Sequence, residues 1–337
     1  MNAVLPERMQ HFETQTELID PRKESLPIPP PPHPSFANRL DGVIVLVSEN
    51  DVYLAKACCA SIRQSMGNIP ITLLVDGLHT DTSEIERLPN VNRLSAPDLA
   101  GEEYSSFWSG FWVKMLVFNH SPYERFLYLD ADTLVWGDVR VYADLEQYDF
   151  IAGLHFDMQQ TFQSEEEIRN FVFDVDAVRK IYPNLNWPGM ALANNGAFFA
   201  RRHVFGEKQL KQLKQMPCWV CYEQGMINFL RWRAIREGQP RVSGCRVQLY
   251  PAQEGFQSIY TSRNRFFPRN NPRPAIIHWI CKKPKFGRRY KAADDYRKLF
   301  LKMTGRKRWL RVRLRLEEFA VWLGKHKRSL LRQKNRS

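Results

Sequence analysis

Two aspartates one residue apart follow a short apolar run in the stretch FLYLDADTLVWGDV, residues 126–139. The run from Phe126 to Leu129 has no polar break, which predicts a buried strand. If Asp130 and Asp132 stay extended, their spacing sends both carboxylates to the same side of the chain. Two like charges this close repel each other, and partial burial raises the cost. A bound cation would relieve this repulsion.

On the residues alone, two interpretations of this Asp-x-Asp pattern stay open. Hard oxygen ligands in an open arrangement suit Mg²⁺ or Mn²⁺, which keep positions free for water and for a substrate phosphate. Alternatively, one aspartate caps the segment after a turn, since such pairs are common in proteins. Because the pair directly follows a buried strand, the metal interpretation and the capping interpretation are about equally supported.

The rest of the chain alternates between strand and helix patterns. Apolar residues between Leu54 and Ile62 fall on one helical face. Residues 156–190 are interpreted as an irregular insertion that is acidic in part. Further strands are predicted over 42–47, 70–77, 149–154, 194–200, 245–250 and 275–279, and further helices over 107–119, 203–215, 222–236 and 292–303.

This alternation predicts an α/β fold with a mostly parallel central sheet and helices on both faces. Ligands of such sheets bind beyond the carboxyl ends of the strands, which is where Asp130 and Asp132 lie. We expect three regions along the chain. They are a flexible, Pro-rich arm over 1–38, a single domain over 39–304 and a basic tail over 305–337.

Composition narrows the classes of protein. No apolar run approaches the roughly 18 residues of a transmembrane helix, and the N-terminus lacks the apolar core of a signal peptide. Six cysteines among 337 residues do not indicate a disulfide framework. Cys218 and Cys221 form a CxxC without a second pair or a nearby histidine, so we interpret them as ordinary thiols. These features predict a cytoplasmic protein.

The basic charge is concentrated in the tail. The whole chain has a net charge of +13, and residues 305–337 hold 12 Lys or Arg and 2 Glu. Aromatic and aliphatic residues such as Trp309 and Trp322 alternate with these cations. A basic helix of this kind is typical of segments that bind the surface of an anionic membrane. We therefore expect peripheral attachment at the inner face of the plasma membrane. Packing against the domain is the alternative, and no motif predicts specific nucleic-acid binding.

The stretch FWVKMLVFNHSPYERFLYLDADTLVWGDV resembles the core of glycosyltransferase family 8. That family, which includes glycogenin and bacterial lipooligosaccharide galactosyltransferases, has a single GT-A domain of Rossmann-like architecture. Its pattern is a K-L-x-x-[FW] helix, a strand ending in D-x-D and a V-x-x-[DN]-[IV] tail. The residues that fit are Lys114, Phe118, Tyr123, Tyr128, Asp130, Asp132, Asp138 and Val139.

Four further stretches match the family's motifs in order. Asn50 to Tyr53 is similar to N-D-x-Y, whose tyrosine stacks on uracil, and Asn194 to Gly196 is similar to N-x-G, which contacts the donor sugar. Glu223 to Asn228 resembles D-Q-[DG]-[IL]-[IL]-N beside the anomeric carbon, with glutamate in place of aspartate. His278 and Trp279 resemble H-[FY], whose histidine is the third metal ligand. The HWICKKPKF stretch lacks the family's glycine after this histidine.

The resemblance implies a role for each matched residue. It implies metal ligation by Asp130, Asp132 and His278, and catalysis by Glu223 and Gln224. The implied donor-binding residues are Asn50, Tyr53, Lys114, Asp130, Ala131, Asn194, Gly196, Lys282 and Lys283.

The implied function is metal-dependent transfer of a hexose from a UDP-sugar, with retention, to a glycan or lipid-linked acceptor in polysaccharide biosynthesis. Mn²⁺ or Mg²⁺ is the implied cofactor. A sugar-nucleotidyltransferase is one alternative, but LVSENDVY is not the Gly-rich, basic phosphate loop that this class needs after its first strand. A non-catalytic domain that binds glycan or nucleic acid is the second alternative, and Asp130 and Asp132 argue against it.

Overall fold

The computed structural model describes residues 40–154, 164–184, 193–216, 218–220, 222–245, 248–251, 274–278 and 291–305, with the single residues 312, 316, 319 and 323. The predicted arm over 1–38 and most of the predicted tail lie outside the described residues. Every strand of the described residues falls within the predicted 39–304 domain, whose boundaries stay a prediction.

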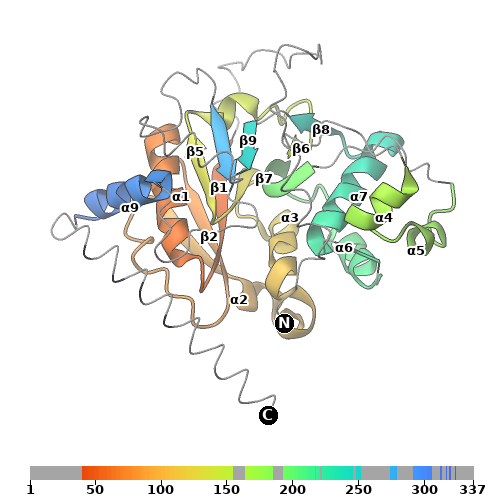
Figure 1. The fold of residues 1–337 in the computed structure, drawn as a ribbon, viewed down its shortest axis with the longest axis horizontal. Helices are drawn as coiled ribbons and strands as arrows, with labels where there is room; N and C mark the ends of the chain where they lie inside the picture. The colour runs from red at the N-terminus through yellow and green to blue at the C-terminus, as the bar shows by residue number, and fades with distance from the viewer. Residues whose placement is uncertain are drawn as a thin grey trace.

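A seven-stranded sheet forms the centre of the fold (Figure 1). Neighbouring strands are parallel everywhere except at the fifth position, where one strand runs antiparallel to both neighbours. The predicted mostly parallel sheet is therefore confirmed. In spatial order the strands are β3 (Val91–Ser95), β2 (Ile71–Asp76), β1 (Gly42–Ser48), β4 (Arg125–Asp130), β7 (Ala193–Arg201), β6 (Phe150–Leu154) and β8 (Val242–Cys245).

A second sheet of three strands, which the sequence did not predict, stands beside the first. Its strands in spatial order are β5 (Thr133–Trp136), β10 (Ala275–His278) and β9 (Gln248–Pro251). β10 pairs antiparallel with β5 and parallel with β9. Only two residues separate the end of β4 from the start of β5, so the chain passes from one sheet to the other at Ala131 and Asp132.

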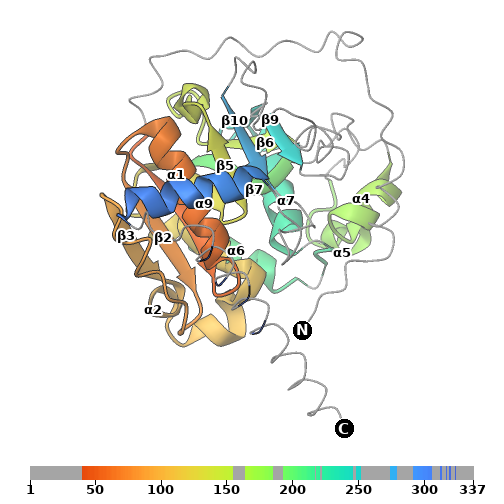
Figure 2. The same ribbon diagram turned by 60° about the vertical axis from the view of Figure 1, so that its left-hand side comes forward.

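Helices cover both faces of the central sheet, as predicted. On one face, α9 (Lys291–Met303) lies across α1 (Val52–Met66) (Figure 2). The short 3₁₀-helix η5 (Val139–Tyr142) also contacts α1. The other face is covered by α2 (Ala96–Ala100), η3 (Tyr104–Trp108), η4 (Gly110–Leu116), α3 (Val117–His120), α4 (Glu165–Phe171), α5 (Val175–Arg179), α6 (Glu207–Lys214) and α7 (Tyr222–Glu237).

Two apolar clusters, one on each face, hold these layers together. Alternate side chains of β4 enter opposite clusters: Leu127 and Leu129 pack on the α1 side, and Phe126 and Tyr128 pack on the α7 side. All four are fully buried. A strand that is covered on both faces needs apolar residues at consecutive positions, which explains the unbroken run in the sequence.

The single helix predicted over 107–119 is wrong. The chain instead forms a π-helical turn over η3, a 3₁₀-helix over η4 and a short α-helix over α3. Gly110 has a φ of +65°, which a right-handed helix does not allow. The residue before it, Ser109, is extended. The path of the backbone therefore breaks before Lys114 is reached.

Two other element predictions also need correction. The segment interpreted as irregular, 156–190, contains α4 and α5. Ser164 and Glu167 form a reciprocal capping box that starts α4, a signal that the sequence carries as S-x-x-E. The strand predicted over 245–250 is two strands, β8 and β9, which belong to different sheets.

The cysteines that the structure describes as free are buried. They are Cys58, Cys59 and Cys218, and burial raises the pKa of Cys58 to about 12 and that of Cys218 to about 11. These values suit unreactive core thiols, in agreement with the interpretation of Cys218. Cys221 lies outside the described residues. Within the described part of the chain, no helix has both the length and the hydropathy to cross a bilayer.

Candidate functional site

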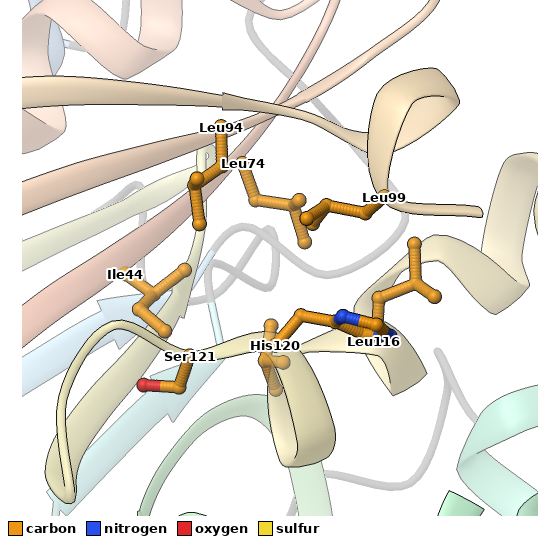
Figure 3. A pocket seen from close by; sticks show the side chains of 8 residues that line it. Ile44, Leu74, Leu94, Leu99, Leu116, His120 and Ser121 are labelled. Atoms are coloured by element: carbon orange, nitrogen blue, oxygen red, sulfur yellow. The ribbon is translucent and has the colours of Figure 1, made fainter. Parts of the chain in front are cut away.

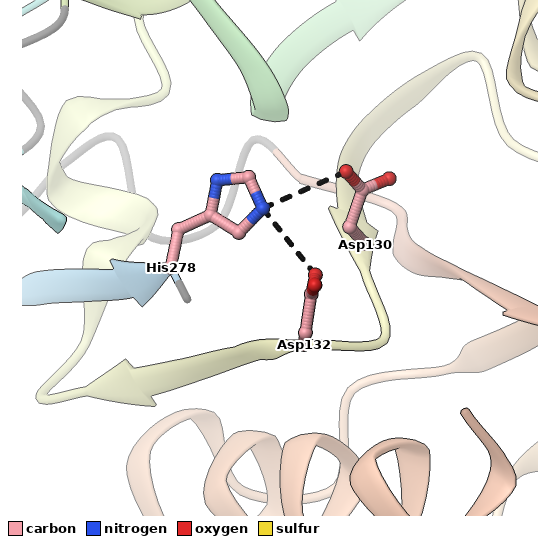
Figure 4. A group of neighbouring side chains, drawn as sticks. All are labelled: Asp130, Asp132 and His278. Atoms are coloured by element: carbon pink, nitrogen blue, oxygen red, sulfur yellow. Dashed lines mark ion pairs between the residues drawn. The ribbon is translucent and has the colours of Figure 1, made fainter. Parts of the chain in front are cut away.

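Asp130, Asp132 and His278 converge at the carboxyl end of β4 (Figure 4). One ligand atom from each lies within 4.8 Å of the others. His278 Nε2 is 3.3 Å from Asp132 Oδ1 and 3.7 Å from Asp130 Oδ2. Two carboxylates and one imidazole are a donor set that suits a divalent metal ion. The three residues predicted as metal ligands are therefore brought together.

The two sheets explain this convergence. Asp130 is the last residue of β4, and the chain turns there into β5. His278 is the last residue of β10 and pairs directly with Thr133, the first residue of β5. A histidine 146 residues away in the sequence is thus placed beside Asp132 by the pairing of two short strands.

The ring of His278 is held from its other side. Its Nδ1 is 3.0 Å from Asn194 Oδ1, an acceptor, so Nδ1 donates to Asn194 and Nε2 is the ring nitrogen that faces the two aspartates. Asn194 Oδ1 also accepts from the amide of Gly196 at 2.8 Å. A Cβ at Gly196 would lie 2.0 Å from His278 Cε1, so only glycine leaves room for the ring.

We expect Asn194→Ala to weaken Mn²⁺ binding about 10- to 100-fold, because the imidazole loses the partner that fixes its tautomer. Isothermal titration with Mn²⁺ in the absence of nucleotide measures this directly. Asn194→Asp keeps an acceptor oxygen and should recover most of the affinity, whereas Asn119→Ala, a change at a part-buried asparagine of α3, should have no effect. Parent-like Mn²⁺ affinity in Asn194→Ala would show that this contact does not orient the ligand.

Lys114 lies between two of the predicted site carboxylates. Its Nζ is 3.3 Å from Asp130 Oδ2 and 3.2 Å from Glu223 Oε1, and its side chain is almost fully buried. Burial by itself would lower the pKa of Lys114, but the charges of Asp130 and Glu223 outweigh it and the pKa is raised. Burial raises the pKa of Glu223, which Lys114 partly offsets. Lys114 therefore remains a cation and neutralises part of this acidic cluster.

Tyr128 fixes the first aspartate, a role the sequence reasoning missed. Its hydroxyl donates to Asp130 Oδ1 at 2.5 Å from a fully buried ring. Burial, together with the charge of Asp130, raises the pKa of Tyr128 well above its ordinary value, so the phenol stays a donor. Oδ2 of Asp130 faces Lys114 and His278. The general signal is the i, i+2 spacing in the strand, which puts both side chains on one face.

The start of α7 is fastened to β7. Asn195 Nδ2 donates to the carbonyl oxygen of Gln224 at 3.1 Å, and Asn228 bonds to both backbone groups of Ala193. This holds Gln224 and the neighbouring Glu223 at the site. Asn195 Oδ1 is buried and accepts no hydrogen bond within the described residues. A buried acceptor without a donor costs free energy, and a ligand hydroxyl could supply the missing donor.

Asn50 follows β1, whose Leu46 is paired with Asp130, so it lies at the same edge of the sheet as Ala131 and the aspartates. Tyr53, the predicted base-stacking residue, is only 7% exposed. The guanidinium of Arg297 on α9 lies 5.4 Å from the centre of its ring. Stacking of a base on Tyr53 stays a prediction, and Arg297 already occupies the neighbourhood of the ring.

Two predicted residues cannot be placed, because Lys282 and Lys283 lie outside the described residues. A pocket elsewhere in the fold does not compete with the site. It opens between β1, β2, β3 and the η4–α3 segment and is lined by Ile44, Leu74, Leu94, Leu99, Leu116, Val117, His120 and Ser121 (Figure 3). Its cavity volume of about 10 Å³ matches one water molecule, too little for a nucleotide.

No protein-family model matches the chain, and no curated protein matches it in sequence. Several solved structures do resemble it. The bifunctional glycosyltransferase WbbM in its apo form has a TM-score of 0.51 and 13% identity, over 84% of this chain and 51% of that chain. The chain has a GT-A glycosyltransferase fold. It spans about half the length of WbbM.

Two further structures are similar to the GT-A domain at lower TM-scores. The galactosyltransferase LgtC in complex with donor and acceptor sugar analogues has a TM-score of 0.46 and 15% identity, over 78% of this chain and 95% of that chain. The glycosyltransferase GlyE of Streptococcus pneumoniae TIGR4 has a TM-score of 0.49 and 14% identity, over 79% and 62%. At these identities the likeness concerns the GT-A fold alone.

Proposed function

We propose that the chain is a metal-dependent glycosyltransferase that moves a hexose from a UDP-sugar to a glycan or lipid-linked acceptor, with retention. The observation that carries this proposal is the cluster of Asp130, Asp132 and His278 at the carboxyl end of β4. In sheets of this kind that end is where ligands bind. The GT-A fold supports the same assignment.

The chain's own residues would divide the work as follows. Asp130, Asp132 and His278 would hold a divalent cation, Mn²⁺ or Mg²⁺, which would supply Lewis-acid stabilisation of the negative charge on the diphosphate. Lys114 adds fixed positive charge beside Asp130. Asn195 Oδ1, which accepts no hydrogen bond from the described residues, would accept one from a hydroxyl of the donor sugar.

Glu223 and Gln224 are the candidates for the catalytic groups next to the anomeric carbon. The ion pair with Lys114 holds the carboxylate of Glu223 at the site, at 3.2 Å. The backbone bond from Asn195 to Gln224 fixes the first turn of α7 against β7. Pre-organised groups of this kind lower the cost of reaching the transition state because they need not reorient.

The test is to incubate the protein with Mn²⁺ and a panel of UDP- and GDP-sugars and to measure release of the nucleoside diphosphate. We expect slow hydrolysis of at least one UDP-sugar that stops on addition of EDTA. Binding of UDP without release of diphosphate from any sugar would support a non-catalytic domain instead. Absence of both binding and release would contradict the proposal.

The tail is proposed to attach this enzyme to an anionic membrane at the inner face of the plasma membrane. Val312, Leu316, Phe319 and Leu323 are helical and between 44% and 61% exposed. Their spacing of four, three and four residues puts them on one helical face. In this structure Leu316 is 61% exposed, which disfavours the packing alternative at this residue.

Deleting residues 305–337 should release the protein from anionic liposomes. Each of the tail's 12 cations that faces the membrane contributes about 1 kcal/mol of binding free energy near such a surface. Insertion of the apolar face into the bilayer adds to this binding. Liposome flotation at low and high salt measures the attachment, which salt should weaken only in part. Neutral liposomes are the control. A full-length protein that does not bind anionic vesicles would contradict the membrane assignment.

A further inference from the structure

Phe111 and Tyr222 form an exposed pair of stacked aromatic rings. Their centroids are 5.1 Å apart, and the ring planes differ by only 11°. Phe111 is 57% exposed and Tyr222 is 42% exposed. Large aromatic side chains are usually buried in the core or in an interface. Two exposed aromatic rings side by side therefore indicate a binding surface.

This aromatic pair lies at the junction of η4 and α7, beside the candidate site. Tyr222 directly precedes Glu223 in the chain. Phe111 lies three residues before Lys114 in a 3₁₀-helix, in which residues i and i+3 are on the same side one turn apart. The ion pair between Lys114 and Glu223 and the aromatic pair therefore join the same two elements, within one turn of each other along each element. Lys114 also contacts Asp130.

The backbone at Tyr222 is held in an unusual conformation. Its φ is +48°, a left-handed value that is strained for a non-glycine residue. Such strain gathers at binding sites, where it aims a side chain in a direction that relaxed backbone would not. At Tyr222 it accompanies a ring that stacks on Phe111 rather than one that is buried.

We propose that Phe111 and Tyr222 form the platform on which a pyranose ring of the acceptor glycan stacks. One face of a pyranose carries C–H groups made slightly positive by the neighbouring oxygens, and these fit the negative face of an aromatic ring. The hydroxyls at the edge of the sugar stay in water or reach the polar groups around Lys114 and Glu223. This inference rests on the proposed glycosyltransferase function and assigns its acceptor subsite.

The test is saturation-transfer difference NMR on the full chain with Mg²⁺ and UDP. The probes are pyranose disaccharides, namely lactose, maltose, cellobiose and N,N′-diacetylchitobiose, with open-chain mannitol as a probe that lacks a flat ring. We expect transfer to at least one disaccharide and none to mannitol. Phe111→Ala and Tyr222→Ala should each weaken that binding about fivefold or more, as for other ring-stacking platforms.

Matched variants separate stacking from general damage. Tyr222→Phe keeps the ring and should retain glycan binding, and Ile235→Ala, an equally exposed change near the far end of α7, should not alter it. The proposal is overturned if no disaccharide binds the parent, if mannitol binds as well, or if both alanine variants bind like the parent. Glycan binding without metal-dependent release of diphosphate from any donor would contradict the proposed enzyme activity but would still support the sugar-binding platform.

Discussion

Asp130→Asn and Asp132→Asn should each lower the affinity for Mn²⁺ by more than about 100-fold. Loss of a residue that only hydrogen-bonds to a metal ligand typically lowers metal affinity roughly 10- to 100-fold, and these two residues are proposed to be ligands themselves. Each change removes a charged ligand from a three-residue set and keeps the size of the side chain. Stability of the metal-free Asp132→Asn variant should hold or rise, because a repulsion between two neighbouring carboxylates is removed. Asp130→Asn should be less stable than Asp132→Asn, because it also loses the ion pair with the buried Lys114. Titration with Mn²⁺ and thermal unfolding in EDTA measure the two effects.

A matched control is Asp176→Asn, which neutralises an aspartate whose side chain is 63% exposed on α5. It should leave the Mn²⁺ affinity unchanged. If Asp132→Asn binds Mn²⁺ like the parent, the capping interpretation of this aspartate replaces the metal interpretation. A large loss of thermal stability together with parent-like Mn²⁺ affinity would point the same way.

Lys114→Met should cost about 3–5 kcal/mol of unfolding free energy, because it leaves two carboxylates without their buried cation. The side chain of Glu223 is 9% exposed and that of Asp130 is 22% exposed, so water cannot replace the lysine fully. Methionine has a similar length, which keeps the packing loss small. Urea unfolding in EDTA measures the change in free energy.

The deficit of Lys114→Met should depend on pH. The pKa of Glu223 is already raised above its ordinary value of 4.5 by burial, and loss of Lys114 raises it further. When the carboxyl pKa is raised in the folded state, the folded protein binds the proton more tightly than the unfolded chain does. The free energy of unfolding is therefore fully retained below the unfolded pKa of Glu223 and falls as the pH rises through the folded pKa. The deficit should therefore be larger at pH 8 than at pH 5.

The double variant Lys114→Met with Glu223→Gln provides the control, since it removes the charge that the lysine neutralised. It should recover much of the lost stability and flatten the pH dependence. A deficit that is equal at both pH values and unchanged in the double variant would mean that Lys114 acts through packing alone.

Local sequence patterns were sufficient to predict the central sheet and the position of the first aspartate. β4 and the position of Asp130 at its end follow from an unbroken apolar run in a covered strand, and the mostly parallel sheet follows from the alternation of elements. The same reasoning failed at 107–119, because one glycine with a positive φ broke an apolar pattern that looked continuous. It missed α4 although the capping box was readable in the sequence.

Long-range pairing was beyond what one sequence shows. Nothing in the apolar run AIIHWIC says that β10 pairs with β5, yet that pairing is what brings His278 to Asp132. The contact between Asn194 and His278, the central place of Lys114 and the stacking of Phe111 on Tyr222 join segments tens of residues or more apart. The family resemblance predicted which residues take part, and the contacts among them required the fold.

The central claim is that one divalent cation sits between Asp130, Asp132 and His278. Crystals grown with Mn²⁺ and UDP and measured for anomalous scattering at the manganese edge would test it most directly. We predict an anomalous peak within about 2.5 Å of His278 Nε2 and of one oxygen from each aspartate. A complex with UDP in which manganese lies elsewhere, or in which His278 points away from it, would contradict the account.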